Sequence, residues 1–156
     1  TFTAIGRDSD KPLNGYHLAA GFIFTLGRFV YEVPYDPHLY FEGEEQTLSV
    51  RAYTHGWDIY HTTHVPVYHL YNTGDAVTSH REVHWSPEAD EKRHQRWWHL
   101  DNKSKERMTN LLHRNKDLGV YGLGNSRSLV EYANFSGIDY RNKTLAPYAK
   151  HKGIVL

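Results

Sequence analysis

The stretch YFEGEEQTLSVRAYTHGWDIY, residues 40–60, decides how the chain folds around its most distinctive pair of charges. Two adjacent carboxylates, Glu44 and Glu45, follow an aromatic run and a glycine, and apolar residues then recur at helical spacing. We therefore predict a short, partly buried helix from Glu44 to His55. Gly56 stands where a glycine commonly ends a helix, because glycine adopts the left-handed conformation without strain.

The two carboxylates allow two readings, which the residues alone leave open. Acidic residues in the first turn stabilise a helix through its dipole, so both can serve the fold alone. On a helix, however, Glu44 shares a face with Arg51 and His55, whereas Glu45 points about 100° away. One carboxylate can then support the helix start while the other faces a cleft. The second reading makes Glu44 and Glu45 candidates for an active site.

Composition limits the classes of protein to which the chain can belong. It has 156 residues, enough for one domain with a core, and its 18 basic residues balance 18 acidic ones. A net charge of zero argues against broad attraction to nucleic acid or to an anionic membrane. The longest mainly apolar run, Leu18 to Leu26, is too short to cross a bilayer. The absence of cysteine fits a reducing compartment, so we expect a cytoplasmic protein without a membrane span.

The rest of the chain predicts a mixed α/β fold. HLAAGFIFTL (17–26) is typical of a buried strand, in which Gly21 allows the close approach of a neighbour or ligand. The other expected elements are an extended stretch at 28–37 with a turn at Tyr35-Asp36-Pro37, two short strands within 57–72, a helix from Ser86 to about Asn115, and a helix that Ser128 and Glu131 begin and Gly137 ends. Their order indicates a small mixed sheet flanked by helices, with a helical C-terminal part.

Histidine is frequent, with 12 residues, and one of them is a candidate metal ligand. His69 ends the second predicted strand beside a polar loop, where an imidazole can bind a metal. A lone histidine in such a place is more often packed or solvated, so both readings stay open. Asp8 and Asp10 form a D-x-D pattern whose oxygens suit Mg²⁺ or Mn²⁺, but DSDKP is also good turn chemistry, and the turn is favoured.

Several linked motifs resemble one enzyme family. They are G-F-x-F (21–24), P-Y-D-P (34–37), F-x-G-E-E (41–45), R-x-x-T-H-G-W-D (51–58) and V-x-H-L-Y (67–71), followed by YGLGNSRSLVEYANFSGID (121–139). In this order they resemble the polypeptide α-N-acetylglucosaminyltransferases, typified by a cytoplasmic enzyme that glycosylates hydroxyproline. The G-E-E motif is also similar to the G-G-E-N of the mucin-type polypeptide N-acetylgalactosaminyltransferases.

The resemblance implies a GT-A fold, a UDP-sugar donor such as UDP-GlcNAc, a protein or glycan acceptor, and transfer with retention of configuration. It implies a divalent metal, Mn²⁺ or Mg²⁺, with His69 as a ligand. Glu44 would lie at the donor sugar, with Glu45 in support. The residues expected at the donor or acceptor are Gly21, Arg51, His55, Trp57 and Asp58.

In that family the uridine site and the metal motif lie well upstream of the G-F-x-F strand. We therefore expect residues 1–156 to form a single domain that corresponds to the acceptor half. Residues 1–85 would form the GT-A-like core, and residues 86–156 the helical extension. The alternative is a non-catalytic module of the same fold that binds a glycan or a protein through its aromatic surface. Nucleic-acid binding through residues 92–114 is disfavoured, because acidic residues interrupt the basic ones there.

Overall fold

The computed structural model describes residues 11–62, 67 and 83–150. The elements in chain order are β1 (Leu13–Gly15), α1 (Phe29–Glu32), α2 (Glu44–Thr54), β2 (Ile59–His61), α3 (Pro87–Glu91), α4 (Trp97–Leu112), the 3₁₀ helix η1 (Gly119–Tyr121), α5 (Leu129–Ser136), β3 (Ile138–Asp139), β4 (Thr144–Leu145) and the 3₁₀ helix η2 (Pro147–Lys150). Strand β1 pairs with β2 and β3 pairs with β4, both antiparallel. The predicted mixed α/β class, with little sheet and several helices, is confirmed.

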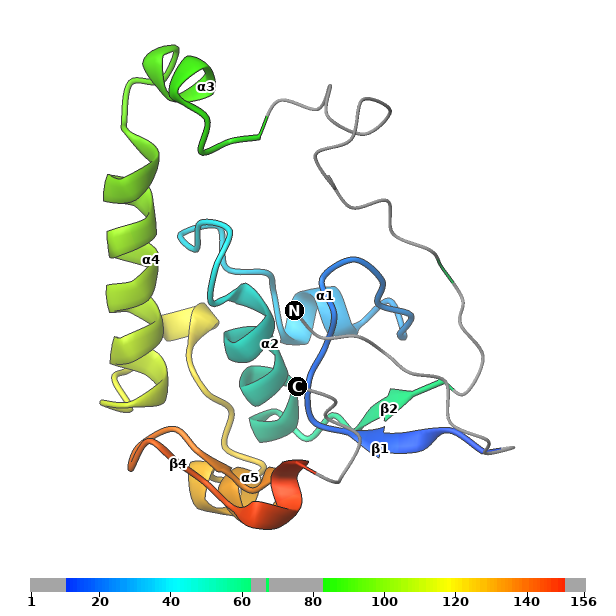
Figure 1. Cartoon of the computed structure of the whole chain (residues 1–156). Helices are drawn as coiled ribbons and strands as arrows, with labels where there is room; N and C mark the ends of the chain where they lie inside the picture. Colours follow the sequence, from blue (N-terminus) through cyan, green and yellow to red (C-terminus); the bar gives the residue numbers. More distant parts are fainter. Residues whose placement is uncertain (1–10, 63–66, 68–82, 151–156) are drawn as a thin grey trace.

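Helix α2 lies in the middle of the molecule, between the long helix α4 and the short helix α1 (Figure 1). Val50 on α2 packs in one core cluster with Leu111 of α4 and Tyr132 of α5. Leu48 of α2 packs in a second cluster with Phe29 of α1. Because α2 contributes to both clusters, the helices of the core are positioned against it.

Two glycines with positive φ set the bounds of α2. Gly43 precedes the helix at φ +92° and Gly56 follows it at φ +93°. The hydroxyl of Thr47 donates to the carbonyl of Gly43 at 2.7 Å, which reinforces the first turn. A Cβ on Gly43 would lie 3.2 Å from the sulfur of Met108, so the helix start is also close to α4. The helix predicted from 44 to 55 is therefore confirmed, ending one residue earlier.

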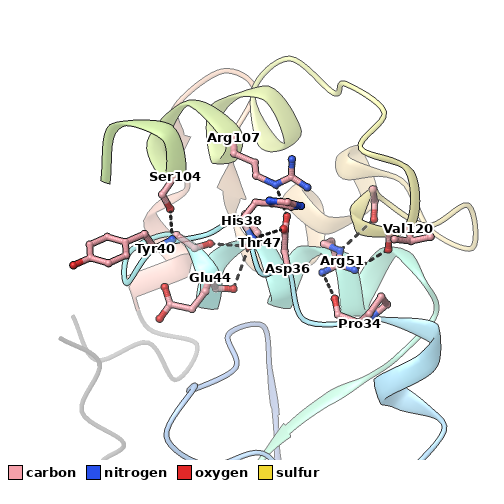
Figure 2. A network of polar contacts seen from close by, with 12 residues as sticks. Pro34, Asp36, His38, Tyr40, Glu44, Thr47, Arg51, Ser104, Arg107 and Val120 are labelled. Carbon is pink, nitrogen blue, oxygen red and sulfur yellow. Dashed lines mark hydrogen bonds and ion pairs between the residues drawn. The ribbon is translucent and has the colours of Figure 1, made fainter. Parts of the chain in front are cut away.

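Arg51 joins three separate parts of the backbone (Figure 2). Its side chain is buried, and its guanidinium donates to the carbonyl oxygens of Pro34 at 2.7 Å, Val120 at 3.1 Å and Gly122 at 3.3 Å. Burial lowers the pKa of Arg51, and the negative charge of Asp36 opposes that effect. Three backbone carbonyls accept from one side chain, so a substitution here leaves the buried bond to Gly122 and the two partly buried bonds unmade.

A second buried charge holds α4 against the segment that precedes α2. Asp36 is 5% exposed, and its carboxylate accepts hydrogen bonds from Nε of Arg107 at 2.6 Å and from the backbone N–H of His38 at 3.0 Å. The guanidinium carbons of Arg51 and Arg107 lie 5.8 and 5.6 Å from the centre of the Tyr121 ring. Arg107 thus pairs with the carboxylate whose charge also acts on Arg51, and both cations lie near one aromatic ring. The predicted turn in this stretch is present, with the N–H of Leu39 bonded to the carbonyl of Asp36.

The same segment is bonded to α4 once more, nearer to the start of α2. The buried hydroxyl of Ser104 accepts from the backbone N–H of Tyr40 at 3.0 Å and donates to the carbonyl of Glu42 at 2.8 Å. Figure 2 shows Ser104 and Tyr40 beside the Asp36–Arg107 pair. Residues 34–42 are therefore fixed to both α2 and α4, which determines where α2 begins.

The prediction of a buried strand at 17–26 is wrong. Only a single bridge between Ala19 and Phe22 forms there, and the Phe24 ring is 92% exposed. The backbone N–H of Leu18 bonds to the hydroxyl of Ser49 on α2, at 2.8 Å. The Ser49 hydroxyl thus accepts the hydrogen bond that the carbonyl of a neighbouring strand would otherwise accept.

Two further predictions need correction. The stretch expected to be extended at 28–37 contains the helix α1. The helix expected from Ser86 to Asn115 is broken into α3 and α4, because the buried carboxylate of Asp90 at the end of α3 accepts the backbone N–H of Trp97 at 2.7 Å. Asp90 therefore caps α4 from a separate helix, which the local sequence does not reveal.

The predicted helix signals elsewhere are confirmed. Ser86 caps α3, Ser128 and Glu131 form the capping box of α5, and Gly137 ends α5 at φ +78°. Of the predicted strands within 57–72, β2 is present and the second lies outside the described residues. The division into 1–85 and 86–156 stays a prediction. Among the described residues no helix has the length and apolar character needed to cross a membrane.

We predict that Arg51→Met lowers the free energy of unfolding by about 2–4 kcal/mol, because three carbonyls lose their donor inside the protein. Urea denaturation measures the change. Arg114→Met is the matched control: Arg114 is exposed and bonds to Asn110 on the surface, so its loss should change stability by less than about 0.5 kcal/mol. Equal effects of the two substitutions would contradict the structural role of Arg51.

Candidate functional site

Glu45 attaches the 17–26 segment to the start of α2. Its Oε1 accepts the backbone N–H of Ala20 at 2.9 Å, and its carbonyl accepts the hydroxyl of Ser49. The bond places Gly21 beside the first turn of α2, exposed and with no atom within 4 Å of where a Cβ would be. One of the two predicted carboxylates therefore positions a loop, and the open space at Gly21 adjoins it.

Glu44 has a different environment. Its side chain is partly buried, and burial raises its pKa, with smaller contributions from the negative charges of Glu45 and Glu42 and an opposing one from its own backbone N–H. No ion pair to Glu44 forms within the part of the chain that the structure describes. In Figure 2 its carboxylate points away from Arg51 and Arg107. Glu44 is thus a carboxylate held near other negative charges and left accessible, which is common for groups that meet a ligand.

Tyr35 completes this end of α2. Burial raises the pKa of its phenol, and the negative charges of Glu44 and Glu45 raise it further. The side chain is still 53% exposed, so its hydroxyl can donate to a ligand. Two carboxylates and one phenol therefore share a partly open surface, a set of groups that suits the hydroxyls of a sugar.

The structure does not bring His55, Trp57 and Asp58 to this place. His55, Trp57 and Asp58 follow the C-terminal end of α2, and at 1.5 Å per residue His55 lies roughly 16 Å along the helix from Glu44. Nε2 of His55 is buried and has no hydrogen-bond partner among the described residues. A ligand that touches both groups of predicted residues must be extended along α2.

Trp57 and Asp58 already have protein partners. The indole N–H of Trp57 donates to Glu32 at 3.0 Å, and its ring packs edge-on against Phe29 at 5.1 Å. Asp58 pairs with Arg127 at 2.8 Å. Arg51 is occupied by its three backbone carbonyls. Their predicted contacts with a donor or acceptor stay predictions, and each also has a structural role that the sequence alone left unassigned.

The predicted metal ligand lies outside the described residues, as do Asp8 and Asp10. Within residues 11–62, 67 and 83–150, no group of three or more His, Cys, Asp or Glu side chains is arranged to hold a metal ion. The described residues therefore do not by themselves make a metal site, and His69 stays a prediction.

Comparison with known families supplies the class of protein. The family model described as Glycosyltransferase (GlcNAc) matches residues 2–142. The chain belongs to this family. No curated protein and no solved structure matches the chain.

The residues matched by the glycosyltransferase (GlcNAc) family model include both ends of α2 and the helices around it. The chain is glycosyltransferase-like, and a sugar donor and an acceptor follow in general terms. The match confirms the family expected from the motifs at this broader level. The hydroxyproline-type assignment, the donor nucleotide, the metal and the retaining outcome are finer statements that it does not reach.

The sequence alone did not indicate a group of aromatic side chains next to Glu44. Phe41, His84 and Trp85 contact one another, with ring centres 4.4 Å apart for Phe41–His84, 5.4 Å for Phe41–Trp85 and 4.5 Å for His84–Trp85. The aromatic run before Gly43 drew attention to Phe41. No short sequence pattern connected Phe41 with the His-Trp pair more than forty residues later.

We predict that Glu44→Gln raises the melting temperature relative to wild type, and that the gain grows between pH 4 and pH 7. A raised carboxyl pKa means that the folded state is disfavoured once Glu44 ionises, so the stability present below the pKa of the unfolded chain is lost as pH rises. Thermal unfolding followed by circular dichroism across this range measures the offset. Asn102→Ala, at an exposed position that does not titrate, should give an offset independent of pH. A Glu44→Gln offset that is flat or shrinks with pH would contradict the assignment.

Proposed function

We propose that this chain is the acceptor half of a metal-dependent retaining transferase that moves N-acetylglucosamine from UDP-GlcNAc to a hydroxyl of a protein or glycan. The family match supports sugar transfer. The linked motifs support the donor, the metal and the retaining outcome, and Glu44 is the residue on which the proposal depends. The absence of cysteine and the resemblance to a cytoplasmic enzyme support a cytoplasmic setting.

The observation that carries the proposal is the different use of the two adjacent carboxylates. Glu45 is bonded to Ala20, while Glu44 stays partly buried, accessible and without an ion pair among the described residues. In transfer from a nucleotide sugar, C1 becomes positively charged as its bond to the diphosphate breaks. A carboxylate placed beforehand beside that centre stabilises the charge or holds the sugar hydroxyls. We assign to Glu44 the role of binding the sugar hydroxyls.

The balanced step needs one bond broken and one formed at C1. The C1–O bond to the diphosphate breaks, UDP leaves with the electron pair, and the acceptor oxygen bonds to C1 from the same side. The acceptor proton leaves to a basic oxygen, for which the departing phosphate suffices. Glu44 and the phenol of Tyr35 hold the sugar during this exchange, and neither forms a covalent bond to it.

A divalent metal, Mn²⁺ or Mg²⁺, belongs to the proposal with His69 as one ligand. When bound, it would neutralise the leaving diphosphate. His55, Trp57 and Asp58 would contact the acceptor. The separation of roughly 16 Å between Glu44 and His55 along α2 favours an extended acceptor, a peptide or an oligosaccharide, over a small molecule.

The second candidate is a module that binds a glycan or protein without catalysis. It is favoured by the exposed aromatic residues of the 17–35 region, where Phe24 is 92% and Tyr31 85% exposed. Exposed rings of this size on one segment are typical of interaction surfaces.

We predict that UDP-GlcNAc binds in a Mn²⁺-dependent way, measured by titration calorimetry on this chain and on one extended upstream of Thr1. Release of UDP from UDP-GlcNAc should fall at least about 100-fold in Glu44→Gln, because the carboxylate that holds the sugar hydroxyls in the transition state is removed. Glu42→Gln is the matched control: its side chain is 63% exposed, and it should retain activity.

A separate experimental result would contradict each part of the proposal. The transferase reading is wrong if neither chain binds UDP-GlcNAc with Mn²⁺ present. The metal assignment is wrong if His69→Ala leaves Mn²⁺-dependent binding unchanged. Binding of a glycan or peptide without any UDP release would support the second candidate instead.

A further inference from the structure

The aromatic group of Phe41, His84 and Trp85, called here the aromatic platform, lies beside the start of α2. Phe41 is 59% exposed and Trp85 47% exposed, although each ring contacts the other and His84. Phe41 is three residues before Glu44. An open aromatic surface is therefore present next to the carboxylates of the candidate site.

The backbone at Phe41 adopts a conformation that costs free energy. Phe41 has φ +58°, in the left-handed region that residues with a Cβ rarely adopt, at a cost of roughly 1–2 kcal/mol. This conformation leaves the ring largely exposed, so burial of the phenyl group returns only part of that cost. Strain that the core does not explain is a feature of ligand-contacting positions.

Hydrogen bonds through Tyr40 hold His84 of the platform in place. The hydroxyl of Tyr40 contacts Nδ1 of His84 at 2.5 Å, Arg93 donates to the same hydroxyl at 3.2 Å, and the backbone N–H of Tyr40 bonds to Ser104. The rings of Tyr40 and His84 meet edge-on at 5.1 Å. The platform is thus held before any ligand arrives, which reduces the entropy lost on binding.

The platform also contains a polar group with no described partner. Nε2 of His84 is buried and has no hydrogen-bond partner among the described residues, while its other ring nitrogen is bonded to Tyr40. This buried imidazole nitrogen can form one more hydrogen bond.

We propose that the aromatic platform binds the face of an N-acetylglucosamine pyranose ring, a subsite that deepens the proposed function and rests on it. The C–H groups of a pyranose face suit the negative face of an aromatic ring, and its rim of hydroxyls suits carboxylates. Glu44, three residues after Phe41, supplies a carboxylate.

The sugar can come from the donor or from a glycan acceptor, and NMR titration separates the two sources. The probes are methyl N-acetyl-β-glucosaminide, UDP-GlcNAc with Mn²⁺, and UDP with Mn²⁺ as the sugar-free control. We expect saturable shifts of the Phe41 and Trp85 ring signals with a sugar-bearing probe. Shifts with the methyl glycoside indicate an acceptor sugar, and shifts with UDP-GlcNAc alone indicate the donor sugar.

Variants test whether the platform carries the binding. Phe41→Gly and Trp85→Ala should each weaken sugar binding at least about fivefold, as expected for the loss of one aromatic contact. Phe41→Gly also removes the unfavourable φ, so its melting temperature should be unchanged or higher while binding falls. A merely structural Phe41 would instead lower the melting temperature. Tyr60→Ala, at a 59% exposed aromatic outside both the platform and the 17–35 region, is the matched control and should bind like wild type.

Three results would overturn the inference: no shift of platform signals by either sugar, equal shifts by UDP alone, or shifts by a proline-rich peptide in place of the sugars. Failure of the proposed function is distinguishable from these. Absence of UDP release, with sugar binding to the platform intact, would reject the transferase and keep the subsite. UDP release that depends on Glu44, with no binding of either sugar-bearing probe to the platform, would reject the subsite alone.

Discussion

The buried guanidinium of Arg51 is the interaction on which the rest of the structure depends. It connects the middle of α2 to Pro34 before the helix and to the loop at 120–122 after α4. With the Asp36–Arg107 pair beside it, the loop segments that surround α2 become fixed with little help from β-sheet. The described sheets have two short strands each, so side-chain bonds to backbone take over the ordering that a larger sheet would provide.

This arrangement determines the chemistry at the start of α2. Residues 34–42 cannot shift without breaking bonds to α2 and α4. Phe41 of the aromatic platform lies within that segment, and Glu44 follows it. The candidate site is therefore supported by rigid elements although its residues come from loops and a helix terminus. Such support from surrounding contacts is what keeps catalytic and binding groups in their working geometry.

The sequence predicted what depends on local signals. Helix α2, its glycine at residue 56, the Ser86 cap and the capping box at Ser128 follow from short patterns and are present. The strand at 17–26 was mispredicted because Ser49 and Glu45 on α2 bond to its backbone, a contact between distant residues. The motifs also indicated the family, which the match confirms at the broader level. Phe41, His84 and Trp85 form one group only in the folded chain, and His69 lies outside the described residues.

Gly43 restricts natural variation next to the site. Its φ of +92° disfavours any residue with a Cβ, and a Cβ there would lie only 3.2 Å from the sulfur of Met108, so two independent reasons disfavour larger side chains. A shorter residue at 108 would relieve the second but not the first. Among relatives that keep the acidic pair, we therefore expect glycine at position 43 even where residue 108 differs. The spacing between Phe41 and Glu44 should then also be kept in these relatives.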